Sequence, residues 1–73
     1  MSRDETILKK HSIVIAGHQT SITLENIFWQ QLKILARQRD ISLSTLVAEI
    51  DANRKVNLSS AIRVYILKEY IKA

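Results

Sequence analysis

One short stretch decides the fold: His18-Gln19-Thr20-Ser21-Ile22-Thr23-Leu24 alternates as a half-buried β-strand does. Its apolar face carries Ile22 and Leu24. Its polar face consists of Gln19, Ser21 and Thr23. The sequence suggests no partner strand elsewhere, and an unpaired strand leaves backbone N–H and C=O groups without hydrogen bonds. We therefore expect an antiparallel two-stranded ribbon between two copies of the chain, related by a two-fold axis.

Length and composition also favour a dimer. The chain has 73 residues, of which 47% are apolar, and it contains no cysteine. A single core of this size seldom stabilises a fold by more than about 3–5 kcal/mol, and disulfide bonds are not available to add to it. We therefore expect an obligate homodimer in which folding and association are coupled.

The sequence gives no indication of a membrane or secretory segment. Its longest apolar run, Ile13 to Ala16, is far shorter than the about 20 residues of a membrane-spanning helix. The first five residues lack the apolar core of a signal peptide. These features predict a cytoplasmic protein with no membrane partner. The formal net charge of +4 favours an anionic partner, although many small basic proteins bind no nucleic acid.

The first 17 residues allow more than one interpretation. Residues 1–11 are polar and basic, and we expect them to form a flexible arm. Residues 12–16 are β-prone, but their isoleucines have the opposite parity to the apolar residues of the strand. Gly17 would permit a bulge or bend that changes the inward face. Alternatively, residues 12–16 form a separate, loosely held strand, and whether they extend the ribbon stays open.

The rest of the chain is predicted to be helical. Apolar residues recur at helical spacing over residues 26–39, 43–54 and 58–72. Asp40 tolerates the left-handed conformation often needed where a helix ends, and Ser42 is a good N-cap for the second helix. Either Asn57 or Ser59 can cap the third.

Four runs, in this order along the chain, resemble a known family. They are Thr20-Ser-Ile-Thr-Leu-Glu25, Phe28-Trp29, Leu43-Ser-Thr-Leu-Val-Ala-Glu-Ile-Asp51 and Asn57-Leu-Ser-Ser-Ala-Ile-Arg63. Together they are similar to a bacterial subset of ribbon-helix-helix proteins that carries a third helix. The resemblance covers about residues 17–70 and implies a mainly α fold with one β-strand, in which an intertwined homodimer places its intermolecular ribbon in the DNA major groove. Residues 12–73 would form this single domain.

Candidate base contacts lie on the polar face of the strand, at Gln19, Ser21 and Thr23. Glutamine can bind adenine through two hydrogen bonds, and serine or threonine can bond most base edges. The alternative is an ordinary solvated strand face. Similar proteins often carry an arginine at the position of Thr23 or near Gln19. Its absence here argues against strong reading of G·C pairs by the ribbon.

Phosphate contacts are expected at the start of the second helix and before the ribbon. The free amides of Ser42, Leu43 and Ser44 and the helix dipole form an anion site, which the resemblance places beside the ribbon. Lys9 and Lys10 are further candidates, and Arg37, Arg39 and Arg54 could add contacts. Plain capping and solvated charge are the alternatives. The expected dimer core consists of Ile22, Leu24, Phe28, Leu32, Leu46 and Ile50.

Catalysis, a cofactor and a metal site are not expected. His11 and His18 have no carboxylate at ligand spacing. Glu49 and Asp51, two residues apart on a helix, point to different faces. The sequence also lacks a glycine-rich loop and a nucleophile-base arrangement.

These features favour a DNA-binding homodimer that regulates transcription. One alternative is an antitoxin that represses its own operon and binds a toxin through a flexible C-terminal tail, of which little is expected after Tyr70. The other alternative is a protein-interaction module that has lost DNA readout, with a partner that the sequence does not identify. A mobility-shift assay over several salt concentrations separates this last alternative from the first two.

Overall fold

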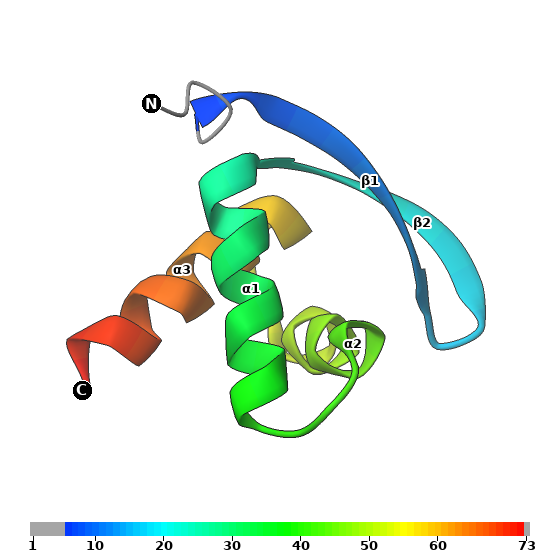
Figure 1. Ribbon diagram of the computed structural model, residues 1–73. Helices are drawn as coiled ribbons and strands as arrows, with labels where there is room; N and C mark the ends of the chain where they lie inside the picture. Colours follow the sequence, from blue (N-terminus) through cyan, green and yellow to red (C-terminus); the bar gives the residue numbers. More distant parts are fainter. Residues whose placement is uncertain (1–5, 73) are drawn as a thin grey trace.

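The computed structural model describes residues 6–72 as two β-strands followed by three helices (Figure 1). The elements are β1 (Leu8–Ile15), β2 (His18–Glu25), α1 (Asn26–Gln38), α2 (Leu43–Asn53) and α3 (Leu58–Ile71). Within these residues, no helix is both long enough and apolar enough to cross a bilayer.

The two strands form an antiparallel hairpin within one chain, with Leu8 opposite Glu25 and Ile15 opposite His18. The predictions of a single unpaired strand and of a fold with one β-strand are therefore wrong. The flexible arm is also wrong for residues 8–11, which belong to β1; residues 1–5 lie outside the described part of the chain. An exposed strand face tolerates lysines, and a segment rich in lysine therefore has the same composition in an edge strand as in a solvated arm.

A two-residue turn, Ala16-Gly17, joins the strands. Both residues have positive φ, at 51° and 83°, as the type I′ turn of tight hairpins requires. The register pairs odd-numbered residues of β1 with even-numbered residues of β2. The isoleucines of β1 therefore share a face with Ile22 and Leu24 without any bulge, which resolves the parity difference seen in the sequence.

The core lies between the inner face of the hairpin and the three helices. Four strand residues contribute to it: Ile13, Ile15, Ile22 and Leu24. Leu32, Leu46, Val47 and Ile62 are fully buried against them. Of the six residues expected in a dimer core, five are buried within one chain and Phe28 packs partly buried against them. Their burial therefore needs no second chain.

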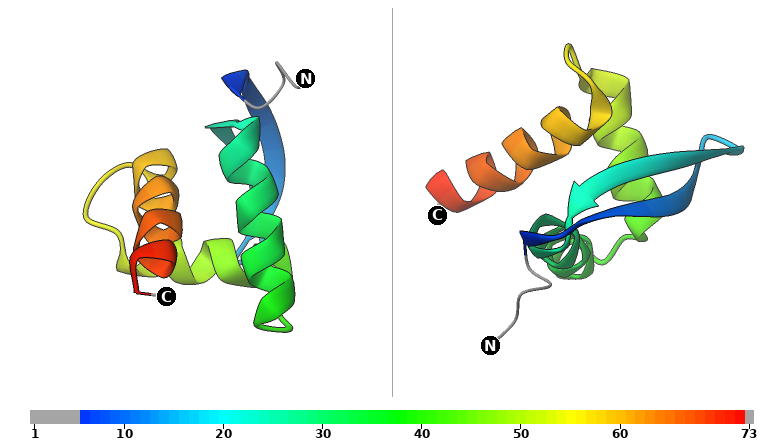
Figure 2. Two further views of the ribbon diagram at one scale, coloured as in Figure 1. Left: turned by 60° about the vertical axis from the view of Figure 1, so that its left-hand side comes forward. Right: turned by 90° about the horizontal axis from the view of Figure 1, so that it is seen from above.

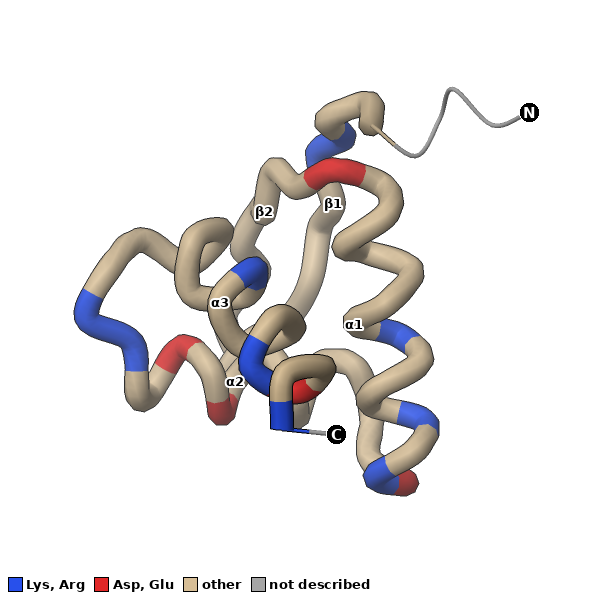
Figure 3. Tube along the Cα trace, turned by 90° about the vertical axis from the view of Figure 1, so that its left-hand side faces the viewer, with Lys and Arg blue, Asp and Glu red and all other residues tan. Residues whose placement is uncertain are grey.

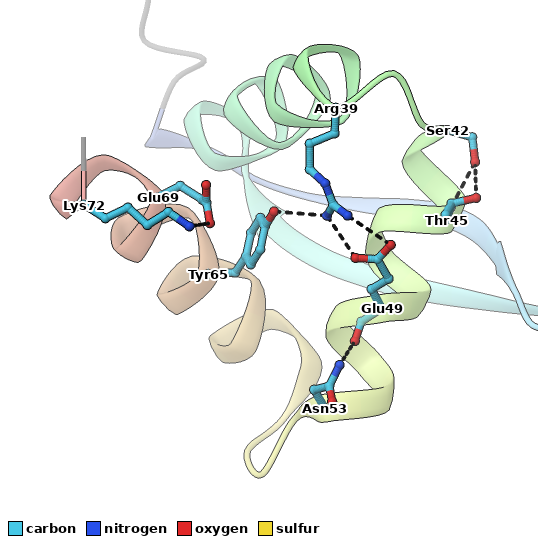
Figure 4. A network of polar contacts seen from close by, with 8 residues as sticks. All are labelled: Arg39, Ser42, Thr45, Glu49, Asn53, Tyr65, Glu69 and Lys72. Atoms are coloured by element: carbon cyan, nitrogen blue, oxygen red, sulfur yellow. Dashed lines mark hydrogen bonds and ion pairs between the residues drawn. The ribbon is translucent and has the colours of Figure 1, made fainter.

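The helices are held by caps and by one polar network. Asp40 has φ 58° after α1, as expected, and the Ser42 side chain caps α2 by accepting from the Thr45 amide. Asn57, not Ser59, caps α3 by accepting from the Ser60 amide. Arg39 donates to both carboxylate oxygens of Glu49, at 2.9 and 3.3 Å, and to the Tyr65 hydroxyl (Figure 4). This network joins the end of α1 to α2 and α3, which pack against α1 (Figure 2).

Candidate nucleic-acid interface

The outer face of the hairpin brings together side chains from both strands. Residues directly opposite in an antiparallel pair share a face. Three of the outer rows are Lys10 with Thr23, Ser12 with Ser21, and Val14 with Gln19, and a fourth, Leu8 with Glu25, lies at the end of the hairpin far from the turn. The six residues of the first three rows are exposed. The three base-contact candidates of β2 therefore lie together, and β1 adds to them a cation, a hydroxyl and an apolar side chain.

Lys9 and Lys10 lie on opposite faces, although the sequence grouped them. Lys10 is on the outer face, opposite Thr23, whereas Lys9 is opposite the buried Leu24. Sequence reasoning missed the outward placement of Lys10 because it assigned residues 1–11 to an arm. The signal was present in the alternation of Lys10, Ser12 and Val14 with Ile13 and Ile15.

Residues of α3 contact the C-terminal end of β2 on the strand edge that faces away from β1. The Asn26 amide donates to the Ile7 carbonyl at 3.0 Å. Because hydrogen-bonded pairs alternate along the ladder, the Thr23 carbonyl points away from β1. The Ser59 hydroxyl donates to that carbonyl at 2.7 Å, and Arg63 pairs with Glu25 at 2.8 Å. This arrangement also holds the pKa of the Glu25 carboxyl below its usual value, through the Arg63 hydrogen bond first.

The start of α2 borders an open depression of about 500 Å³. Ser42 and Leu43 line it, together with two basic residues of α1, Lys33 and Arg37, and with Asp40. Figure 3 shows basic residues along the C-terminal half of α1. Lys33 and Arg37 in this half line the depression. The free amides at the helix start and these cations form a chemically suitable place for a phosphate.

Other basic residues proposed as phosphate contacts have acidic partners. Arg39 pairs with Glu49, and Arg54 pairs with Asp51 at 2.7 Å. Glu49 and Asp51, the acidic partners in these pairs, are the two carboxylates that the sequence had indicated to be poor candidates for acid-base catalysis. Among residues 6–72, no group of three or more histidine, cysteine, aspartate or glutamate side chains could hold a metal ion.

The His11 side chain of β1 contacts Trp29 of α1. Its ring stacks on Trp29 with 3.8 Å between centroids and an interplanar angle of 9°. In the described residues, His11 Nε2 is the one buried side-chain nitrogen or oxygen that has no hydrogen-bond partner. Burial, followed by the charges of Lys9 and Lys33, lowers the pKa of His11 below 6.5.

Acid should therefore weaken the fold through His11. The folded state binds a proton at His11 less readily than the unfolded state does. The contribution of neutral His11 to the free energy of unfolding is therefore complete above pH 6.5, and it decreases as the pH falls from 6.5 towards the lowered pKa of the folded state. We expect urea unfolding to give a smaller free energy of unfolding at pH 5.5 than at pH 7.5. The variant His11→Phe, which keeps a stacking ring, should lose less stability over this interval. An equal loss in both proteins would contradict the assignment.

Comparisons with known proteins agree with this geometry. The structure of an uncharacterized protein from Bordetella pertussis Tohama I is similar to this one, with a TM-score of 0.80 and 21% sequence identity. The similarity covers 97% of this chain but only 62% of that chain, and at this identity it concerns the fold. None of the curated proteins compared with the chain matches it. The model of a family described as a ribbon-helix-helix domain matches residues 8–70, which include both strands and nearly all of α3, and the chain belongs to this family.

Proposed function

We propose that this chain is a transcriptional regulator of the bacterial cytoplasm that binds double-stranded DNA with the outer face of its hairpin. The observation that carries the proposal is the composition of that face: besides the exposed apolar Leu8 and Val14, it presents an exposed lysine, three exposed hydroxyl side chains and a glutamine over two strands. The major groove, about 12 Å wide, admits a two-stranded β-ribbon. Neighbouring strands lie about 4.8 Å apart, so the hairpin has the width of such a ribbon.

Phosphates would be held beside the groove by the start of α2. The amides of Ser42, Leu43 and Ser44 supply donors, and Lys33 and Arg37 supply positive charge at the same depression. Asp40 also borders it and opposes an anion, so the amides and the two cations must outweigh one carboxylate. Lys9 is a further phosphate candidate because it is exposed on the hairpin but does not share the outer face.

The chain would act as a homodimer, which is typical of this family. The helices leave large apolar side chains at least 40% exposed, and a second copy could cover them: Ile27, Ile34, Val64, Leu67, Tyr70 and Ile71. In the intertwined form predicted from the sequence, β2 would pair with its copy along its free edge. The bond from Ser59 to the Thr23 carbonyl occupies part of that edge. A dimer that leaves each hairpin intact is therefore the better-supported arrangement.

Selection of bound duplexes from a random pool tests the proposal. The protein should enrich a defined sequence, and its affinity for that duplex, measured by fluorescence anisotropy, should fall steeply with salt because each phosphate contact contributes about −0.9 to the log-log slope. Sedimentation of the complex should give two chains on each selected duplex.

The outcomes of this experiment are separable. One chain on each selected duplex would contradict the dimer but not DNA binding. Absence of any enriched sequence, together with no binding at low salt, would contradict DNA binding and favour a protein-interaction module. Specific binding would leave the antitoxin alternative open, and a co-purifying toxin would then decide between the two regulators.

A further inference from the structure

The row that pairs Lys10 with Thr23 has the chemistry to read guanine. Lysine is a donor to the O6 and N7 acceptors of guanine in the major groove. Lys10 forms no ion pair within 4.0 Å among residues 6–72. The one acidic side chain on the same strand pair, Glu25, is bonded to Arg63. Within the described part of the chain the ammonium group therefore has no carboxylate partner, and the opposite residue is an uncharged threonine.

The row that pairs Val14 with Gln19 has the chemistry to read an A·T pair. Glutamine can bond adenine N6 and N7, and an apolar side chain can contact the thymine methyl group. Val14 is 52% exposed among the polar side chains at the turn end of the outer face, where contact with a methyl group would cover it. The row between the two, Ser12 with Ser21, carries only small hydroxyl side chains and can bond either purine or pyrimidine edges.

The two rows have a fixed separation. They lie four residues apart on each strand, which is about 13 Å at a rise of about 3.3 Å per residue. Base pairs of B-DNA follow one another at about 3.4 Å along the axis. A ribbon in the major groove follows the groove, which also turns around the axis at about ten base pairs per turn, so the path along it is longer than about 3.4 Å per base pair and the rows span about two to three base pairs.

We propose that Lys10 is a specificity-determining residue of the hairpin, and that the chain prefers DNA in which a guanine read by Lys10 lies about two to three base pairs from an A·T pair read by Gln19 and Val14. This inference rests on the proposed function and extends it to the base sequence. It also explains how a ribbon without arginine on β2 can still read a G·C pair, because the cation comes from the neighbouring strand.

Lys9 provides a matched control for Lys10. The variants Lys10→Ala and Lys9→Ala each remove one positive charge from adjacent, exposed residues, but on opposite faces of the hairpin. Affinity is measured by anisotropy for the duplex that the wild-type protein selects and for duplexes changed at single base pairs. Thermal unfolding by circular dichroism confirms that both variants are folded.

Lys10→Ala should lose discrimination at the guanine position by about 5- to 150-fold, the equivalent of about 1–3 kcal/mol for one good base contact. Discrimination at the A·T position should persist in Lys10→Ala and decrease in Gln19→Ala. Lys9→Ala should keep both preferences and at most weaken binding equally for all duplexes.

Three results would overturn the proposal. If Lys10→Ala and Lys9→Ala lower the affinity by the same factor for every duplex, Lys10 contacts phosphates and not bases. This result is expected if β2 pairs with its copy, because β1 would then lie at the edge of a four-stranded sheet. A selected site without a guanine and an A·T pair at this spacing would contradict the base assignment while leaving DNA binding intact. A wild-type protein that enriches no sequence would contradict the proposed function and the inference together.

Discussion

Leu24→Lys is expected to leave the protein unfolded at room temperature. The Leu24 side chain is fully buried and faces the core from β2. Truncation of such a leucine alone costs about 2–5 kcal/mol, and the new ammonium group would be buried without a carboxylate partner. It would also lie directly opposite Lys9. Because a single core of this size seldom stabilises a fold by more than about 3–5 kcal/mol, circular dichroism should show no cooperative thermal transition.

Thr23→Lys is the control for this variant. It introduces the same side chain one residue earlier, on the exposed outer face, where the alternation of the strand directs it to solvent. Its melting temperature should stay close to that of the wild-type protein. A cooperative Leu24→Lys transition within a few degrees of the wild type would contradict the burial of Leu24 beneath the hairpin.

The sequence predicted the elements that have regular local signals. Alternation located β2, helical spacing located three helices, and Ser42 and Asp40 were identified correctly at the junction of α1 and α2. In each case the signal lies within a few residues of the feature that it specifies. Asn57 was one of two candidates for the α3 cap, and only the position of α3 shows why Ser59 is directed elsewhere, towards the Thr23 carbonyl.

The hairpin could not be predicted with the same ease. Hairpins with two-residue turns are usually marked by Asn-Gly or Asp-Gly, whereas this one turns at Ala16-Gly17, with alanine in the sparsely populated positive-φ region. Lys9, Lys10 and His11 further hid the strand because they resemble a solvated arm. Missing β1 had two consequences. It removed Lys10 from the expected outer face, and it made an unpaired strand the main argument for a dimer.

Alanine at Gln19, Ser21 and Thr23 together should remove sequence discrimination without unfolding the protein. These side chains are exposed, so substitution changes no core contact. Each base contact of good geometry contributes about 1–3 kcal/mol of discrimination. The ratio of specific to nonspecific affinity should therefore fall by about 150-fold if the three contacts add at about 1 kcal/mol each, and by about 5-fold if only one of them discriminates. Nonspecific binding should largely persist, because the α2 amides and the basic side chains are unchanged.

A double variant, Gln30→Ala with Gln38→Ala, provides the comparison. Both glutamines are exposed on α1 and belong to neither strand of the hairpin, so loss of polar surface by itself should leave the affinity ratio unchanged. If the triple alanine variant is folded and keeps its full ratio, the side chains of β2 are not the readers. Discrimination would then have to come from β1 alone or from DNA shape. A lower ratio of specific to nonspecific affinity in Lys10→Ala would show that β1 reads the bases. If neither strand's variant alters the ratio, the hairpin does not recognise DNA, and an interaction with another protein becomes the better explanation for its exposed face.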